Sequence, residues 1–141
     1  MDATRIAYEK RKAADWARKM LDSDPIIVDL ETTGLKNAEI VQIGVIDFSG
    51  KVLMDTLVKP TGQIPAEVIR IHGITNEMVV DAPTFTDLYT EFSVLLAGKI
   101  VIAYNVAYER GVIRGECKLR KLPVPRINKW ACAMLTYAQF W

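Results

Sequence analysis

The stretch Ile26-Ile27-Val28-Asp29-Leu30-Glu31-Thr32-Thr33-Gly34-Leu35 decides the fold of this 141-residue chain. Its apolar, β-branched start predicts a short buried strand. Asp29 and Glu31 lie two positions apart, so both carboxylates project from the same side of that strand. Two ionised carboxylates this close repel each other unless a cation lies between them or one of them holds a proton. Hard divalent cations such as Mg²⁺ take oxygen ligands of this kind.

The residues that follow the two acids make the pattern specific. A bare pair of acids also fits a strand edge with two solvated carboxylates. Here the string from Val28 to Leu35 continues into a Thr-Thr-Gly turn, whose N–H groups and hydroxyls suit a phosphate or a sugar. The full string resembles the first motif of the DEDD (DnaQ-like) 3′–5′ exonucleases. That resemblance implies a ribonuclease-H-like α/β fold, with a mixed sheet and flanking helices.

A second segment, Tyr104-Asn105-Val106-Ala107-Tyr108-Glu109, resembles the second motif of the same family. Asn105 and Tyr108 match that motif, but Glu109 stands where the family usually has Asp. The longer side chain moves the carboxylate by about a bond length, and catalytic sites tolerate displacements of only about 0.5 Å. Glu109 is therefore expected to coordinate through a different rotamer, through water, or not at all. The alternative is an exposed acid that the helix dipole favours at a helix start.

The third motif of the family, a His or Tyr and an Asp on a later helix, has no match. No Asp or Glu follows Glu116, and no His follows His72. Either the chain is a fragment, or it is a natural short form without catalysis. The apolar, aromatic run from Leu135 to Trp141 favours a C-terminally truncated domain, because a chain end seldom exposes such a run. We expect the exposed apolar patch to promote homo-oligomers.

The rest of the pattern predicts an α/β domain over residues 24–141, preceded by a helical extension over 1–23. Apolar runs on either side of Ser49-Gly50 predict a hairpin buried on both faces. A strand over 99–103 is expected to run parallel to the first strand. The predicted helices cover residues 3–22, 66–70, 75–80, 84–97 and 105–122.

Composition indicates a globular protein, and the cysteine usage indicates a cytoplasmic one. Half of the residues are hydrophobic and a quarter are charged. The longest apolar stretch is broken by a glycine and a lysine, too short for a membrane span. The two cysteines lack metal-binding spacing, which predicts reduced thiols.

The net charge of +1 combines basic segments over 1–20 and 110–129 with an acidic centre. This distribution suits a nucleic-acid enzyme, although each basic segment alone also fits a solvated helix face. Arg110, Arg114, Lys118 and Lys121 share one helix face, which either follows a substrate backbone or faces water.

The resemblance implies metal-dependent hydrolysis at the 3′ end of a single DNA or RNA strand, with two Mg²⁺ or Mn²⁺ ions. Asp29 would bridge both ions, Glu31 would bind one, and Glu109 would bind the other. The substrate contacts implied by the resemblance are Thr32, Thr33, Gly34, Leu35, His72, Ile74, Asn105 and Tyr108. The competing hypothesis is a non-catalytic module of the same fold that binds nucleic acid or a protein partner.

Overall fold

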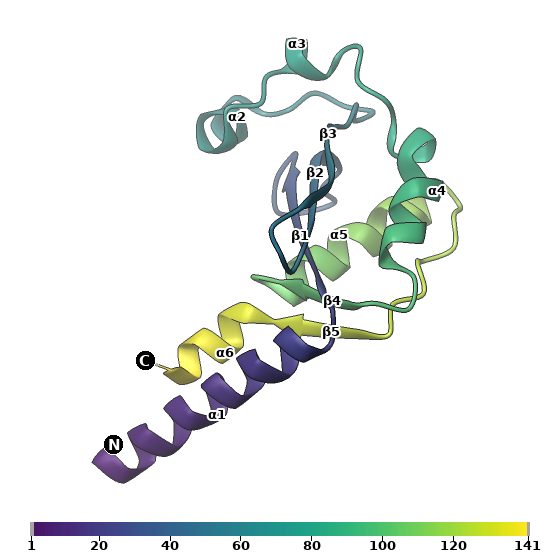
Figure 1. Cartoon of the computed structure of the whole chain (residues 1–141). Coiled ribbons are helices and arrows are strands. Elements are labelled where there is room, and N and C mark those ends of the chain that lie inside the picture. Colours follow the sequence, from purple (N-terminus) through teal and green to yellow (C-terminus); the bar gives the residue numbers. More distant parts are fainter. Residues whose placement is uncertain (1, 141) are drawn as a thin grey trace.

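A mixed five-stranded sheet forms the centre of the molecule (Figure 1). The computed structural model describes residues 2–140. The strand order is β3-β2-β1-β4-β5, with antiparallel pairs β1–β2 and β2–β3 and parallel pairs β1–β4 and β4–β5. The strands are β1 (Ile26–Thr32), β2 (Ile40–Asp47), β3 (Val52–Leu57), β4 (Ile100–Ala103) and β5 (Lys129–Cys132). This arrangement confirms the predicted α/β class, with an antiparallel meander that leads into parallel strands.

Helices α1 to α5 follow the order expected from the sequence pattern. The helices are α1 (Ala3–Asp22), α2 (Ala66–His72), α3 (Asn76–Val79), α4 (Phe85–Leu96), α5 (Val106–Leu119) and α6 (Ala133–Phe140). Side-chain hydroxyls of Thr75 and Thr84 accept hydrogen bonds from the first turns of α3 and α4. Such caps satisfy N–H groups that have no partner inside the helix. Strand β5 and helix α6 were not predicted from the sequence.

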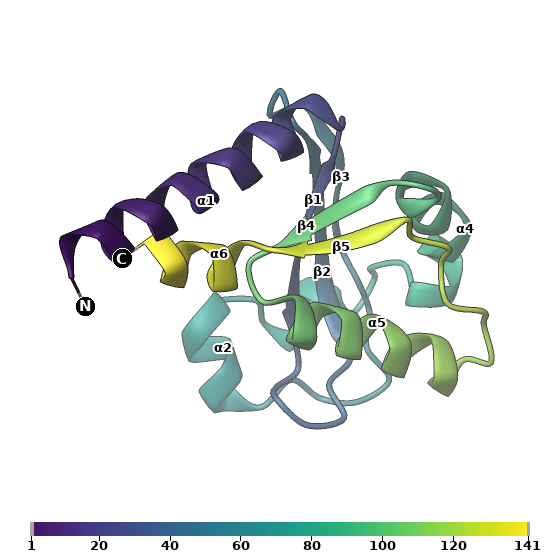
Figure 2. The same ribbon diagram turned by 90° about the horizontal axis from the view of Figure 1, so that it is seen from below.

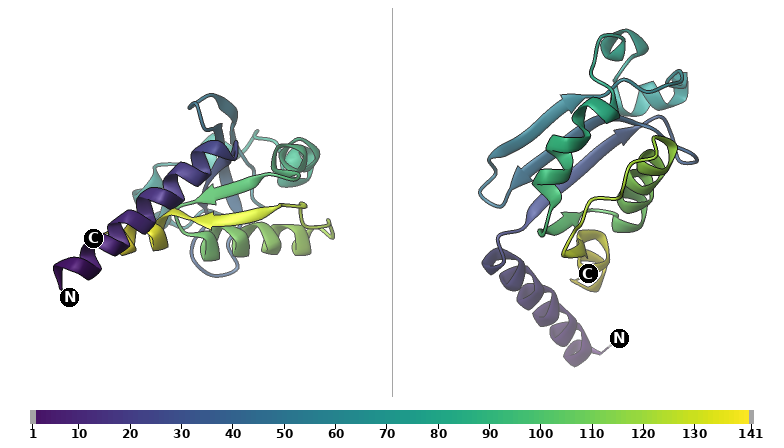
Figure 3. Two further views of the ribbon diagram at one scale, coloured as in Figure 1. Left: turned by 60° about the horizontal axis from the view of Figure 1, so that its bottom comes forward. Right: turned by 90° about the vertical axis from the view of Figure 1, so that its right-hand side faces the viewer.

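Helices α4 and α5 pack on the same face of the sheet and enclose the main core (Figures 1 and 3). Phe85 and Phe92 of α4 are fully buried, and their rings meet edge to face with centroids 6.1 Å apart. Ile113 of α5 packs into the same cluster. Apolar burial on this scale is the main source of folding free energy.

The predicted burial of the hairpin on both faces is wrong. Ile43 and Val45 of β2 are fully buried, whereas Gln42, Gly44 and Ile46 on the opposite side are partly exposed. Helices α4 and α5 both cover the Ile43 side, so the Ile46 side stays open. Apolar composition showed that the strand is hydrophobic but did not show how many layers cover it. The open side is also the side from which the acids of β1 project.

The N-terminal helix α1 lies beside α6 (Figures 1 and 2). Its start is capped by Asp2, whose carboxylate accepts a hydrogen bond from the Arg5 N–H at 2.9 Å. Only Ala13 and Met20 of its 20 residues are buried. Of the apolar C-terminal run, Leu135 and Tyr137 are exposed, while Trp141 lies outside the described residues. No helix within residues 2–140 is long and apolar enough to cross a membrane.

Substitution of a single isoleucine on each side of β2 tests this assignment of faces. We expect Ile43→Ala to lower the free energy of unfolding by about 2–5 kcal/mol, since it leaves a cavity in a packed core. Ile46→Ala, on the open side, removes fewer contacts and should cost less than half as much. Urea unfolding of the two variants measures the difference. Equal losses would mean that both sides of β2 are covered.

Candidate active site

A fork between two parallel strands creates the site. β1 pairs with β4 at Ile26 and Ile27, and beyond these residues the two strands separate. Helix α5 begins in the space between them, immediately after β4. Asn105 caps this helix, and its side-chain oxygen accepts a hydrogen bond from the Tyr108 N–H at 3.4 Å. Ligand sites in α/β sheets form at the carboxyl ends of strands where such a fork opens.

The fork brings Glu109 into the neighbourhood of both acids of β1. Glu109 is 5% exposed, Glu31 is half-buried, and Asp29 is exposed on the open side. Burial, together with the negative charges of Asp29 and Glu31, raises the pKa of Glu109 to about 7. A hydrogen bond from the main chain of Leu30 acts in the opposite direction. The position of Glu109 is therefore not that of a solvated helix-start acid.

The carboxylates at this fork are donors of the type that hard divalent cations bind. Within residues 2–140, no three His, Cys, Asp or Glu side chains lie close enough together to form a complete metal-binding group. One carboxylate oxygen of Glu109, Oε2, is nevertheless buried without a hydrogen-bond partner. A buried polar atom of this kind is costly unless a ligand or ion satisfies it. Carboxylate oxygens are the donors that Mg²⁺ and Mn²⁺ prefer.

A small hydrogen-bond network shapes the turn after β1. The hydroxyls of Thr32 and Tyr108 lie 2.9 and 2.8 Å from the main-chain oxygen of Gly34 and 2.5 Å from each other. Gly34 has a φ of 153°, in the region that favours glycine. The network ties the turn to helix α5 and leaves Leu35 beyond it with 88% of its surface exposed.

A buried ion-pair cluster holds the rest of this loop in place. Arg120 pairs with Glu116, which is 1% exposed, and also with Glu39 at 3.1 Å. Glu116 accepts a hydrogen bond from the Ile40 N–H at 2.7 Å, at the start of β2. Thr33 and Glu39 exchange hydrogen bonds across the loop. Sequence analysis missed this cluster, although the i, i+4 spacing of Glu116 and Arg120 is a recognisable signal for an ion pair.

His72 and Ile74 take supporting positions. His72 Nε2 lies 3.0 Å from the main-chain oxygen of Thr32, and its Nδ1 accepts a hydrogen bond from the Ile74 N–H. The histidine thus joins the end of β1 to helix α2. Ile74 is buried in a second, smaller core with Val41 and Val79. Its contact with a substrate stays a prediction, and the structure places it among core residues.

Comparison with known proteins matches this architecture to nucleases. Residues 26–140 match the protein family described as Exonuclease. An uncharacterized exonuclease, CP81, of Escherichia phage 186 is 42% identical over 130 residues, which cover 88% of this chain and 67% of the relative. The DNA polymerase III subunit epsilon of Treponema pallidum is 32% identical and is matched over 54% of its length, by 77% of this chain. The chain thus spans about half to two thirds of these two relatives.

Solved structures show the same fold. Exonuclease X in complex with 5′ overhanging duplex DNA superposes with a TM-score of 0.62 at 30% identity, over 82% of this chain and 63% of that one. Escherichia coli exonuclease I in complex with a dT13 oligonucleotide reaches a TM-score of 0.67 at 16% identity, over 78% of this chain and 28% of that one. Helix α1 lies before the region that matches the family.

The raised pKa of Glu109 predicts a specific pH dependence of stability in the metal-free protein. Between its ordinary value of 4.5 and about 7, folded Glu109 keeps a proton that the unfolded chain releases. The contribution of protonated Glu109 to the free energy of unfolding is therefore complete below pH 4.5 and is lost as the pH rises through about 7. We expect wild type to lose about 1 kcal/mol or more between pH 5 and pH 8 relative to Glu109→Gln.

Thermal unfolding in EDTA, followed by circular dichroism, measures this difference. The glutamine side chain stays neutral throughout, while all other titrating groups remain common to both proteins. Identical pH profiles for wild type and Glu109→Gln would show that Glu109 keeps an ordinary pKa and is not held near the acids of β1.

Proposed function

This chain belongs to the Exonuclease family, and from that membership we propose that it removes nucleotides from the 3′ end of a nucleic-acid strand by metal-dependent hydrolysis. The observation that carries the proposal is the position of Glu109, whose buried carboxylate is near enough to Asp29 and Glu31 for their charges to raise its pKa, and whose Oε2 has no partner. The main chain of Leu30 hydrogen-bonds this carboxylate, but its Oε2 is buried without a partner and could be satisfied by a cation.

The residues that would hold the divalent metal are Asp29, Glu31 and Glu109. Mg²⁺ or Mn²⁺ bound there would supply an activated water and neutralise charge on the leaving 3′ oxygen. The open side of the sheet, where Asp29 is exposed, leaves room for a phosphodiester next to these acids.

The turn after β1 is proposed to hold the terminal nucleotide. Leu35 projects into solvent beside it and presents an apolar surface on which a base can stack. Thr32 and Tyr108 hold Gly34, so the turn is formed before substrate arrives, and Asn105 fixes the start of α5. A preformed loop loses less conformational entropy on binding.

A second candidate function is strand binding without hydrolysis. The observation that favours it is the row of exposed basic residues Arg110, Arg114 and Lys118 on α5. The open sheet face and the basic face of α5 would serve a binding protein equally well.

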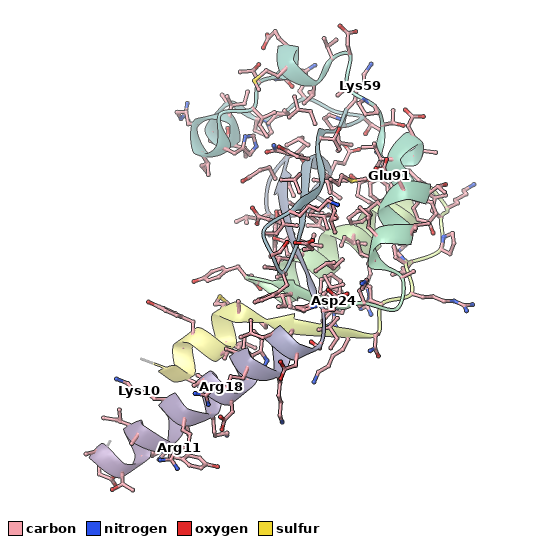
Figure 4. All side chains as sticks on the ribbon, in the orientation of Figure 1. Lys10, Arg11, Arg18, Asp24, Lys59 and Glu91 are labelled. Atoms are coloured by element: carbon pink, nitrogen blue, oxygen red, sulfur yellow. The ribbon has the colours of Figure 1, made fainter. Side chains whose placement is uncertain are left out.

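Release of the terminal nucleotide distinguishes the two functions. A 3′-labelled single strand, incubated with this chain and Mn²⁺, should yield labelled mononucleotide. Asp29→Ala should reduce that rate on the order of 100-fold or more, as loss of one positioned electrostatic partner does in other enzymes. Glu91→Gln removes one exposed charge on α4, far from the fork, and serves as the control (Figure 4).

Strand binding without any release of nucleotide would contradict hydrolysis and support the binding module. Release that persists in Asp29→Ala would show that another group carries the reaction.

A further inference from the structure

A groove of about 820 Å³ runs between the loop 35–39 and one face of helix α5. Its inner end is lined by Leu35 and Tyr108, which belong to the turn proposed to hold the terminal nucleotide. From there it follows α5 as far as Leu119. With a rise of 1.5 Å per residue, the helix face from Ala107 to Leu119 is about 18 Å long. The groove therefore continues the proposed nucleotide site away from the metal ligands.

The floor of the groove is kept empty by two glycines. Gly111 and Gly115 lie one helical turn apart and are exposed, and a Cβ added at either would meet no atom within 4 Å. Each glycine inside a helix costs about 0.5–1 kcal/mol relative to alanine. Packing inside the protein does not require them, because the space above them is open. They allow a ligand to approach the helix backbone.

A row of basic residues on α5 runs beside the groove, and Lys118 of this row lines it. Arg110, Arg114 and Lys118 are spaced four residues apart and are exposed beside the glycines. None of the three forms an ion pair with an acid of residues 2–140, whereas Arg120 at the end of the same helix is paired twice. Unpaired cations in a row beside an open groove are complementary to a chain of phosphates.

We infer that this groove is a second nucleic-acid subsite, which holds the part of the strand that lies upstream of the 3′ end. The inference rests on the proposed function for the direction of the strand. Phosphates lie against Arg114 and Lys118, and the sugar-phosphate chain passes over Gly111 and Gly115. Leu35, at the junction, separates the terminal nucleotide from those that follow.

Strands of two lengths test the inference. Fluorescence anisotropy would measure the binding of labelled dT2 and dT12, made with phosphorothioate linkages that resist hydrolysis, in Mg²⁺. We expect Arg114→Gln/Lys118→Gln to weaken dT12 about tenfold and to change dT2 less than twofold. Because each phosphate contact on a single strand contributes about 0.7 to the slope of log K against log salt, the slope for dT12 should fall by about 1.4.

The matched control is Lys59→Gln/Lys129→Gln, which removes the same charge from exposed positions outside the groove; Lys59 is labelled near α4 in Figure 4. A second variant, Gly115→Leu, fills the groove without changing charge. It should weaken dT12 while leaving the melting temperature equal or higher, because leucine favours the helix more than glycine. A merely structural role for Gly115 would lower the melting temperature instead.

The outcomes separate this inference from the proposed function. Each of four results would overturn the inference. The control variant could lose as much dT12 affinity as Arg114→Gln/Lys118→Gln, or the latter could lose as much affinity for dT2 as for dT12. Alternatively, Gly115→Leu could bind dT12 as wild type does, or wild type could fail to bind dT12. A length-dependent loss without any nucleotide release by wild type would support the groove and refute hydrolysis. If wild type releases nucleotides but the groove variants bind dT12 as tightly as wild type does, hydrolysis is supported and the groove is refuted.

Discussion

The separation of β1 from β4 after Ile27 is the constraint on which the site depends. It frees the edge of β1 beside Asp29 and Glu31 and opens the space in which α5 begins. Glu109 is then carried into that space with its carboxylate almost completely buried. Burial of one carboxylate near two others is unfavourable unless a proton or a cation compensates, and the pKa of Glu109, raised to about 7, reflects that cost.

Helix α5 is fixed at both ends, which links the fork to the substrate loop. At its start, Asn105 caps the helix and Tyr108 holds Gly34. At its end, Lys121 adopts a positive φ of 56°, and the N–H groups of Lys121 and Leu122 bond back to Lys118 and Cys117. This is the Schellman arrangement, which ends a helix sharply. Arg120 lies at that end and joins the helix to the loop through Glu39 and Glu116.

The sequence was sufficient for the order of the elements from α1 to α5, but not for β5 and α6. Alternation placed Asp29 and Glu31 on one side of a strand, and helical spacing located α1, α4 and α5. The sequence did not show that one side of β2 is open, because apolar composition does not reveal how many layers cover a strand. Helix α5 ends at Leu119 rather than near Leu122, because Lys121 adopts a positive φ that closes the Schellman arrangement and no glycine or asparagine at that position signals it.

The roles of residues outside the fork could be assigned only from tertiary contacts. Ile74 resembles a substrate contact in its sequence context, yet its side chain packs in the smaller core. His72, the single histidine, ties β1 to α2 through the main chain of Thr32. The basic residues of α5 were visible as a stripe, but only the fold shows that a groove with a glycine floor lies beside them.

Direct titration with Mn²⁺ is the measurement that tests the fork most sharply. Isothermal calorimetry at pH 8 would compare wild type with Glu109→Gln and with the exposed control Glu91→Gln. If Glu109 shares a cation with Asp29 and Glu31, the affinity for Mn²⁺ should fall at least about tenfold in Glu109→Gln, as expected when a ligand is lost, and should be unchanged in Glu91→Gln. Equal affinity in all three proteins, or no binding to wild type, would contradict a metal site at this fork.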